Sequence, residues 1–182
     1  MAGDVYVVSG PSGAGKGSLL ERVIPKLDNI WLSVSATTRQ PRVGEQDGVH
    51  YFFISSEKFD NLIAMDGMLE WACVHGERYG TIRSAVEDRL EKGIDVLLEI
   101  DPKGAFQVLE KIPDAVLIFI DAPSVIELRR RLRKRGTETE AAIRKRIKDS
   151  AEITKYRDRY HQVIVNDNFD KAAEELLELF RK

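Results

Sequence analysis

A short segment near the start of the chain combines glycines with one lysine, in a pattern that suits phosphate binding. The apolar run 5–8 leads into the sequence SGPSGAGKGS at 9–18. It matches the G-x-x-x-x-G-K motif, whose glycines turn backbone N–H groups toward phosphates while Lys16 adds a fixed positive charge. The amphipathic stretch 19–27 predicts a helix, whose N-terminus favours anions. The pattern predicts a nucleoside-triphosphate site, against the alternative of a chance glycine turn. Its residues are Gly10, Pro11, Ser12, Gly13, Ala14, Gly15, Lys16, Gly17 and Ser18.

The residue after the lysine departs from this motif. A Ser or Thr normally follows the lysine and contacts Mg²⁺ through its hydroxyl. This chain has Gly17 there, and Ser18 comes one position later. The sequence therefore predicts no direct side-chain ligand for the metal, and Mg²⁺ held through water and phosphates near Glu99.

Two arginines in the segment after the first helix suit a second phosphate. Arg39 and Arg42 lie three residues apart around Pro41, which stiffens the turn between them. Guanidinium groups can hold a dianionic phosphate through charge-assisted, often bidentate, hydrogen bonds. Tyr51 and Tyr79 can add neutral O–H donors. The alternative is a solvated basic loop.

A carboxylate lies in an otherwise apolar stretch. Glu70 occurs within Leu69-Glu-Trp-Ala72, and a carboxylate in such surroundings needs a partner. Guanine presents N1–H and its 2-amino group side by side, which matches a carboxylate, whereas adenine presents an acceptor at N1. The alternative is a structural ion pair.

Further charged residues follow a predicted strand or cluster on predicted helices. Glu99 and Asp101 come directly after the apolar run 96–98, where acidic groups can orient Mg²⁺ and its waters, or simply cap or solvate a loop. The basic runs 129–135 and 144–146 are expected to be mostly solvated or paired with Glu138 and Glu140. Some of these arginines can close over a triphosphate, because phosphoryl transfer needs positive charge where negative charge spreads.

The elements that must position these residues alternate between strands and helices. Short apolar runs at 96–98, 115–120 and 163–165 are typical of strands buried on both faces of a parallel sheet. Helical spacing occurs over 81–92 and again from Ala173 to Phe180. Capping boxes begin helices after Ser124, with Glu127, and after Thr137, with Glu140. These patterns predict an α/β fold with ligands at the carboxyl ends of the strands.

The segment 32–80 differs from the rest, because its alternating and aromatic residues suggest a small antiparallel sheet in a lobe of its own.

Bulk properties fit a soluble, cytoplasmic, single-domain protein. The chain has 182 residues, a formal net charge of −2 and one cysteine, Cys73. A net negative charge argues against a general nucleic-acid binder. No apolar run approaches the ~20 residues that span a bilayer. The histidines lack metal-ligand spacing, and nothing in the sequence determines an oligomeric state.

Taken together, these motifs give the chain a resemblance to guanylate kinases over essentially its whole length. The motifs that carry it are GPSGAGK at 10–16, SVSATTRQPR at 33–42, LEWA at 69–72, YGT at 79–81, LEID at 98–101, RGTETE at 135–140 and VIVND at 163–167. The resemblance implies a three-layer P-loop fold with a parallel core sheet, an inserted mixed GMP-binding lobe and a helical lid. It implies a core at 1–32, 81–123 and 160–182, a lobe at about 33–80 and a lid at about 124–159.

The resemblance also implies roles for single residues in a kinase that uses MgATP to phosphorylate GMP, and with it dGMP, to the diphosphate. Asn166 and Asp167 resemble neighbours of the ATP adenine, and Arg135 and Arg146 resemble lid arginines that act in catalysis with Lys16 and Arg42. The implied GMP-binding residues are Ser35, Arg39, Arg42, Tyr51, Glu70, Tyr79, Thr81, Glu99 and Asp101. The family usually has Asp where this chain has Glu99.

Two other functions remain open at this point. A kinase of the same fold could act on a phosphorylated sugar, although Ser35 and Glu70 speak for guanine. A related binding module could recognise phosphorylated peptides, although such a module need not retain Lys16 and the lid arginines.

Overall fold

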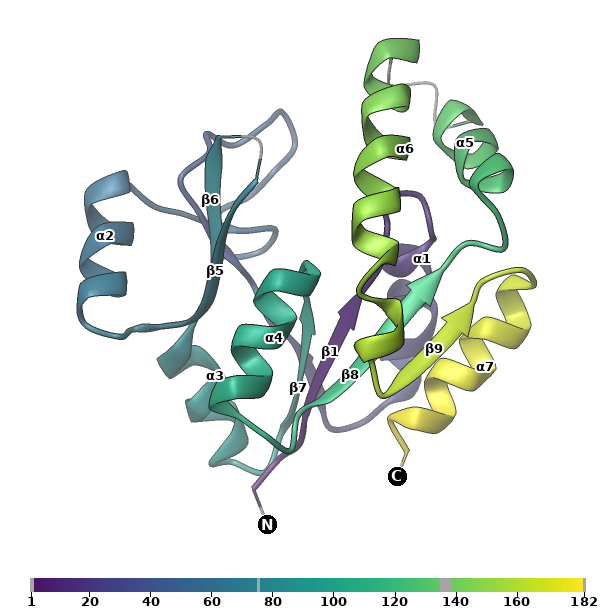
Figure 1. Ribbon diagram of the computed structural model, residues 1–182. Coiled ribbons are helices and arrows are strands. Elements are labelled where there is room, and N and C mark those ends of the chain that lie inside the picture. The colour runs from purple at the N-terminus through teal and green to yellow at the C-terminus, as the bar shows by residue number, and fades with distance from the viewer. Residues whose placement is uncertain (1, 75, 135–138, 182) are drawn as a thin grey trace. The chain divides into compact units, whose positions relative to one another are not determined.

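The strands predicted from apolar runs belong to one five-stranded sheet. In the computed structural model shown in Figure 1, its strand order is β2-β7-β1-β8-β9. The strands are β1 (Val5–Ser9), β2 (Ile30–Leu32), β7 (Asp95–Glu99), β8 (Val116–Asp121) and β9 (Gln162–Val165). The structure describes residues 2–74, 76–134 and 139–181.

Burial along these strands follows their position in the sheet. β1 and most of β8 are buried, as a continuous apolar run predicts for a strand covered on both faces. β9 pairs in parallel with β8 but lies at the edge of the sheet. Val163 and Val165 consequently remain 36% and 41% exposed, so the prediction of burial on both faces is wrong for β9.

The second sheet lies within residues 36–82, close to the predicted lobe at 32–80, and its strand order is β4-β3-β6-β5. Its strands are β3 (Ala36–Thr37), β4 (Phe52–Phe53), β5 (Met68–Val74) and β6 (Glu77–Ile82). β6 pairs antiparallel with β3 and β5, whereas β3 and β4 are parallel, so the sheet is mixed rather than purely antiparallel. The helix α2 (Ser56–Ala64), which the sequence reading missed, contributes Phe59 to a small core with Ala36 and Met68.

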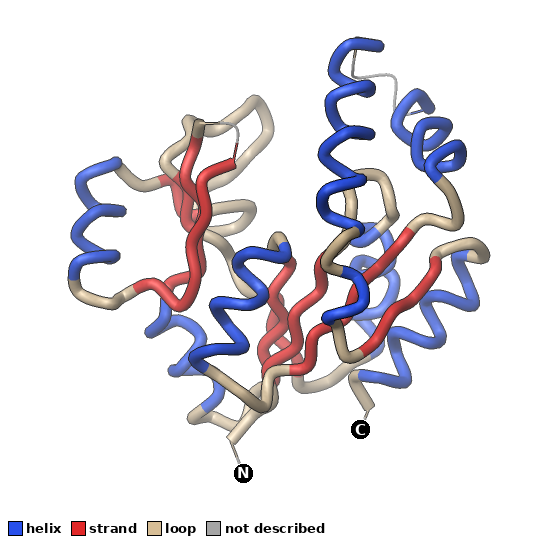
Figure 2. The backbone as a smooth tube through the Cα atoms, in the orientation of Figure 1, coloured by secondary structure: helices blue, strands red, loops and turns tan. Residues whose placement is uncertain are grey.

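Helices occupy most of the remaining chain (Figure 2). They are α1 (Lys16–Val23), α3 (Arg83–Leu90), α4 (Pro102–Lys111), α5 (Val125–Lys134), α6 (Glu140–Thr154) and α7 (Phe169–Leu179), with 3₁₀ turns at Ile24–Lys26 and Arg157–Arg159. The predicted C-terminal helix is confirmed, since Ala173, Leu176 and Leu177 are buried on α7.

The helix starts follow the capping signals in part. The Ser124 hydroxyl accepts the Glu127 N–H at 3.1 Å, as its capping box predicts. α6 is capped by Thr139, which accepts from the Ala142 N–H. Thr137, the predicted cap, lies outside the described residues. The helix predicted from residue 81 begins at Arg83, because pairing of β6 with β5 continues to Ile82.

The chain divides into two compact units. Unit 1 comprises Met1–Tyr6, Trp31–Leu98 and Lys103–Ala115, and unit 2 comprises Val7–Ile30, Glu99–Pro102 and Val116–Lys182. The parallel strands, the flanking helices and the separate mixed sheet confirm the predicted α/β fold class. Among the described residues, no helix combines the length and the apolar character needed to cross a membrane.

Candidate active site

The phosphate-binding loop lies in unit 2, between β1 and α1. Gly10, Gly13 and Gly15 have φ values of 147°, 89° and 97°, which residues with a side chain rarely adopt. A Cβ atom on Gly10 would also lie 2.0 Å from the carbonyl oxygen of Ile120 on β8. The glycines therefore serve both the turn of the loop and its close approach to the neighbouring strand.

Lys16 begins α1 and points back into the loop. Its Nζ donates to the carbonyl oxygens of Gly10, at 2.8 Å, and Pro11, at 3.2 Å. The ammonium group is thus held at the centre of the loop, at the N-terminus of a helix, where its charge and the helix dipole attract the same anion.

Gly17 and Ser18 lie on the exposed side of the first turn of α1. An ideal Cβ on Gly17 would have no heavy atom within 4 Å, so a serine side chain has room there. Ser18 lines a pocket of about 320 Å³. The pocket is lined by Gly13, Gly15, Ser18, Arg131, Lys134, Asn166, Asp167 and Phe169. The two residues predicted near the adenine thus lie in one pocket with the loop.

Asn166 is buried and holds the loop in place. Its Nδ2 donates to the carbonyl oxygen of Ala14 at 2.8 Å, and its side chain is 3% exposed. Nδ2 also lies 2.4 Å from the position of an ideal Cβ on Gly15, which explains why a glycine is needed there. Asn166 therefore acts on the loop itself, beyond the adenine role that the sequence suggests.

Arg131 is a site residue that the sequence reading did not single out. Its Nη2 donates to the carbonyl oxygen of Asn166 at 2.8 Å, and its Nη1 donates to that of Ala14 at 3.3 Å. Glu127, one turn earlier on α5, accepts from Arg131 Nε at 2.7 Å. The hydrogen bonds from Arg130 and Arg131 lower the pKa of Glu127 to about 2. The spacing of Glu127 and Arg131, four residues apart, was the available signal within the basic run.

Of the two predicted lid arginines, the structure describes one. Arg146 on α6 donates from Nη1 to the Ser12 hydroxyl of the phosphate loop at 2.5 Å. Arg135 lies outside the described residues. Arg133 pairs with Glu140 at 2.6 Å, as expected for most of the basic run.

Glu99 and Asp101 belong to unit 2, at the carboxyl end of β7. Glu99 is exposed and Asp101 is half-buried just before α4. Burial raises the pKa of Tyr160, and the charge of Asp101 adds to this rise.

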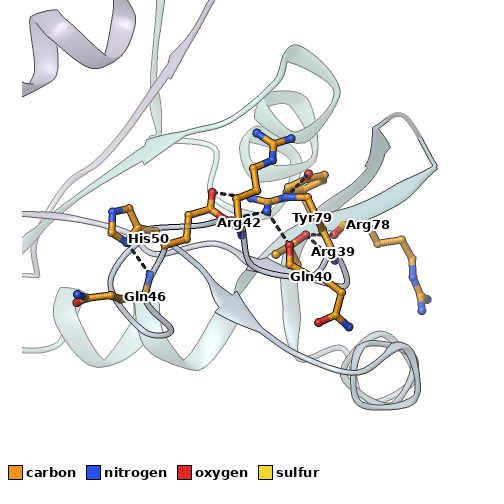
Figure 3. Close-up of polar contacts among 9 residues, drawn as sticks. Arg39, Gln40, Arg42, Gln46, His50, Arg78 and Tyr79 are labelled. Carbon is orange, nitrogen blue, oxygen red and sulfur yellow. Dashed lines mark hydrogen bonds and ion pairs between the residues drawn. The ribbon is translucent and has the colours of Figure 1, made fainter. Parts of the chain in front are cut away.

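The predicted phosphate cage lies in unit 1. Arg39 Nε donates to the Tyr79 hydroxyl at 3.2 Å, and Figure 3 shows the two side chains pointing toward each other. Arg39 Cζ lies 5.2 Å from the centre of the Tyr51 ring, which meets the Tyr79 ring edge-on at 5.9 Å. The structure thus brings Arg39, Tyr51 and Tyr79 together. Arg42 lies in the exposed loop of the same cage.

Glu45 completes this cluster, and the sequence reading missed it. Its carboxylate takes both ends of the Arg39 guanidinium, with Nη1–Oε2 at 2.7 Å and Nη2–Oε1 at 2.9 Å. It also accepts the Arg42 main-chain N–H at 2.7 Å. The hydrogen bonds from Arg39 and from the Arg42 backbone hold the pKa of Glu45 at about 2.

Glu70 and Thr81 form a buried pair in the mixed sheet. Thr81 Oγ1 donates to Glu70 Oε1 at 2.7 Å, and the side chains face each other across β5 and β6. Glu70 is 4% exposed and lies next to a bulge in β5. The Thr81 hydroxyl is thus one of the partners that the buried Glu70 carboxylate requires. Ser35 lies half-buried just before β3, and its carbonyl accepts the Phe52 N–H at 2.9 Å.

The predicted residues therefore form two clusters, one in each unit. Across 2–74, 76–134 and 139–181, no group of three or more His, Cys, Asp or Glu side chains could hold a metal ion.

Comparisons with known proteins agree with this geometry. A family model described as guanylate kinase matches residues 2–182. A guanylate kinase of Caldanaerobacter subterraneus subsp. tengcongensis is 51% identical over 174 residues, which cover 96% of this chain and 84% of the relative. A guanylate kinase of a Synechococcus species is 51% identical over 170 residues, covering 93% and 90%. The crystal structure of guanylate kinase from Anaplasma phagocytophilum superimposes with a TM-score of 0.78 at 36% identity, covering 99% of this chain and 85% of that one. The predicted family and enzyme class are confirmed, and the chain belongs to the guanylate kinase family.

Proposed function

We propose that this chain transfers the γ-phosphoryl group of ATP to GMP, with dGMP as a further substrate, and that unit 2 holds ATP while unit 1 holds most of the guanine and phosphate of GMP. The reaction gives ADP and GDP. The phosphate loop around Lys16, the pocket beside Asn166 and the arginine cluster around Arg39 each match one part of these two nucleotides. Family membership supports the same reaction.

The buried carboxylate of Glu70 carries the assignment of guanine. It is nearly inaccessible, it accepts from Thr81, and a carboxylate has about four lone-pair sites to offer. The N1–H and 2-amino donors of guanine can each donate to this carboxylate, whereas the N1 acceptor of adenine would face it with a lone pair and repel it. Ser35 and Asp101 are further guanine contacts in this proposal.

Transfer needs no covalent intermediate. The acceptor is a phosphate oxygen of GMP, which displaces ADP at the γ-phosphorus in line. Lys16, Arg42 and Arg146, together with Arg135, supply positive charge where negative charge spreads in the transition state. Alignment of two bound nucleotides and exclusion of water provide the remaining acceleration.

Magnesium fits the residues of this chain as a nucleotide-bound ion. Mg²⁺ keeps several waters in nucleotide sites and needs only one or two carboxylates besides the phosphates. Glu99 provides an exposed carboxylate at the end of β7, and the Ser18 hydroxyl on the pocket wall can donate to a phosphate oxygen. When bound, the ion neutralises phosphate charge. Glu99 would hold one of its waters, and it also counts among the residues near GMP.

The division into core, GMP-binding lobe at about 33–80 and lid at about 124–159 belongs to this proposal, and so does a cytoplasmic location. The exposed free thiol of Cys73 supports a reducing compartment.

A coupled ADP-release assay tests the proposal, with GMP, dGMP, AMP, UMP and CMP measured in parallel at saturating MgATP. Turnover should be saturable with GMP and dGMP and should be lower by orders of magnitude with the other three. Equal rates with AMP and GMP, or ADP release that does not depend on the monophosphate, would contradict it. A phosphorylated-sugar substrate belongs in the same panel as a control.

A further inference from the structure

Among the described residues, partners engage four of the five N–H donors of the Arg39 guanidinium. The group has five N–H donors in a planar fork. Nε donates to Tyr79, Nη1 donates to both the Gln40 carbonyl at 2.8 Å and Glu45, and Nη2 donates to Glu45. Nη1 and Nη2, the two nitrogens that could bind a phosphate in a bidentate manner, thus both donate to the Glu45 carboxylate.

Glu45 also fixes the main chain of the second arginine. The same oxygen, Oε2, accepts from Arg39 Nη1 and from the Arg42 N–H, each at 2.7 Å. In return the Glu45 N–H donates to the Arg42 carbonyl at 3.0 Å, which closes a four-residue turn. Gly44 has φ 88° at the third position of this turn, where a type II turn requires a positive φ. Glu45 therefore sets the distance between the Arg39 head group and the backbone of Arg42.

Arg39 and Arg42 differ in how many of their N–H donors remain available to a phosphate. The Arg39 side chain is 12% exposed and paired, whereas the Arg42 residue is exposed in its loop. Within the part of the chain that the structure describes, no carboxylate forms an ion pair with the Arg42 side chain, whose charge nevertheless adds to the lowering of the Glu45 pKa. A phosphate that binds at this cluster can therefore accept from the Arg42 guanidinium, from the Tyr79 hydroxyl and from the second Nη2 hydrogen of Arg39.

We propose that Glu45 is a positioning residue of the GMP-phosphate site: it holds Arg39 against Tyr79 and leaves Arg42 as the arginine whose fork grips the phosphate. This inference rests on the proposed function, in which Arg39 and Arg42 bind the phosphate of GMP. It predicts that Glu45 acts on the GMP phosphate, mainly through Arg39 and also through the main chain of Arg42, and has no part in binding the base.

The first test separates phosphate binding from base binding in Glu45→Gln. The variant keeps the length of the side chain but loses its charge and turns an amide group toward N–H donors. The KM for GMP should rise about three- to tenfold, the range expected when an ordered side chain becomes free, while kcat stays within about twofold. Affinity for guanosine, which lacks the phosphate, should not change, and neither should the KM for ATP. Glu57→Gln, an exposed glutamate on α2, is the matched control and should behave like the wild type.

A double-mutant cycle tests the route through Arg39. Once Arg39→Ala has removed the guanidinium, Glu45→Ala should cause a smaller loss in GMP affinity than it causes in the wild type, because residues that act as one unit are not additive and only the bond to the Arg42 N–H then remains. Additive losses would show that Glu45 acts elsewhere and would overturn the proposal. A lower KM for GMP in Glu45→Gln would also overturn it, since Glu45 would then be an anion that competes with the phosphate.

Three further outcomes are decisive. Equal losses for GMP and guanosine, with a lower melting temperature, would reduce Glu45 to a structural residue of its loop. A wild-type protein that binds GMP no more tightly than guanosine would remove the phosphate site, and this proposal with it. Normal phosphate-dependent binding in the wild type with no change in Glu45→Gln would overturn the role of Glu45 alone.

Discussion

Thr81 Oγ1 and Glu70 Oε1 lie 2.7 Å apart in a buried hydrogen bond across β5 and β6. The threonine presents a single O–H donor, whereas the carboxylate offers about four lone-pair sites, so this bond does not exhaust its capacity as an acceptor. The sheet thereby holds a buried carboxylate in a fixed orientation beside a threonine hydroxyl, as a site that reads hydrogen-bond donors requires.

Removing the charge of Glu70 should therefore damage base selection. Glu70→Gln should lower kcat/KM for GMP by about two orders of magnitude, because hydrogen bonds to charged groups are worth roughly 1.5–3 kcal/mol each. The wild type should prefer GMP over AMP by roughly 10⁴ or more, since an analogue without the donors leaves buried polar groups unpaired. Steady-state assays with both nucleotides measure this, with Glu57→Gln as the control. Unchanged selectivity in Glu70→Gln would assign base recognition to other residues.

Arg39 and Arg146 should separate binding from chemistry. Arg39→Ala should mainly raise the KM for GMP, because Arg39 binds the phosphate of GMP, which is the acceptor and not the group that is transferred. Arg146→Ala should mainly lower kcat, by up to about 10³-fold, because its charge acts on the transition state. Arg130→Ala, an exposed arginine on α5, is the control. If Arg146→Ala raised only the KM for GMP, the proposed division of roles would be wrong, and Arg135→Ala offers a second test.

The glycine after the loop lysine should be compatible with activity. A serine at position 17 meets open space, so Gly17→Ser should fold normally and change kcat by less than about tenfold, ~1.4 kcal/mol. Lys16→Met should lose several orders of magnitude, because water cannot replace its charge. Turnover is measured as a function of Mg²⁺ concentration for the three proteins. An inactive wild type that Gly17→Ser restores would show that the hydroxyl ligand is indispensable.

Asn166 should support ATP binding through the loop. Asn166→Ala removes the shorter of the two side-chain hydrogen bonds to the Ala14 carbonyl and leaves that from Arg131, which costs about 0.5–1.5 kcal/mol of stability. The KM for ATP should rise by about tenfold, whereas affinity for GMP should be unchanged. Chemical unfolding and assays at varied ATP measure the two effects, with Asn61→Ala, exposed on α2, as the control. A loss confined to GMP would contradict the placement of Asn166.

Acid should weaken the fold partly through Glu127. Arg130 and Arg131 lower the pKa of Glu127 from its usual 4.5 to about 2 in the folded state. A lowered pKa means that the unfolded state binds the proton first, so this stabilisation is complete above pH 4.5 and is lost between about pH 4.5 and 2. Urea unfolding at pH 7 and pH 3 should show a smaller acid loss in Glu127→Gln than in the wild type. An equal loss in both proteins would contradict the pairing.

Much of the site could be predicted from the sequence because its parts are local. The phosphate loop, the strand before it and the helix after it form one continuous segment, so spacing alone indicates how they bind phosphate. The apolar runs of β7 and β8 and the repeat of α7 likewise follow from the periodicity of burial. The fold class and the family needed no information beyond this order of motifs.

The tertiary structure decided what depends on pairing between distant segments. Tyr79 reaches Arg39 from a strand 40 residues away, and Arg131 reaches Ala14 across 117 residues. No local pattern indicates that Glu45 pairs with the Arg39 guanidinium. Carboxylates and phosphates are both anions, so a carboxylate is not expected beside a predicted phosphate site. The parallel pairing of β3 with β4 and the exposure of β9 were likewise decided by strand order. The sequence determines which side chains are present and the local periodicity of the apolar residues. Strand order and loop closure determine which side chains from distant segments come into contact.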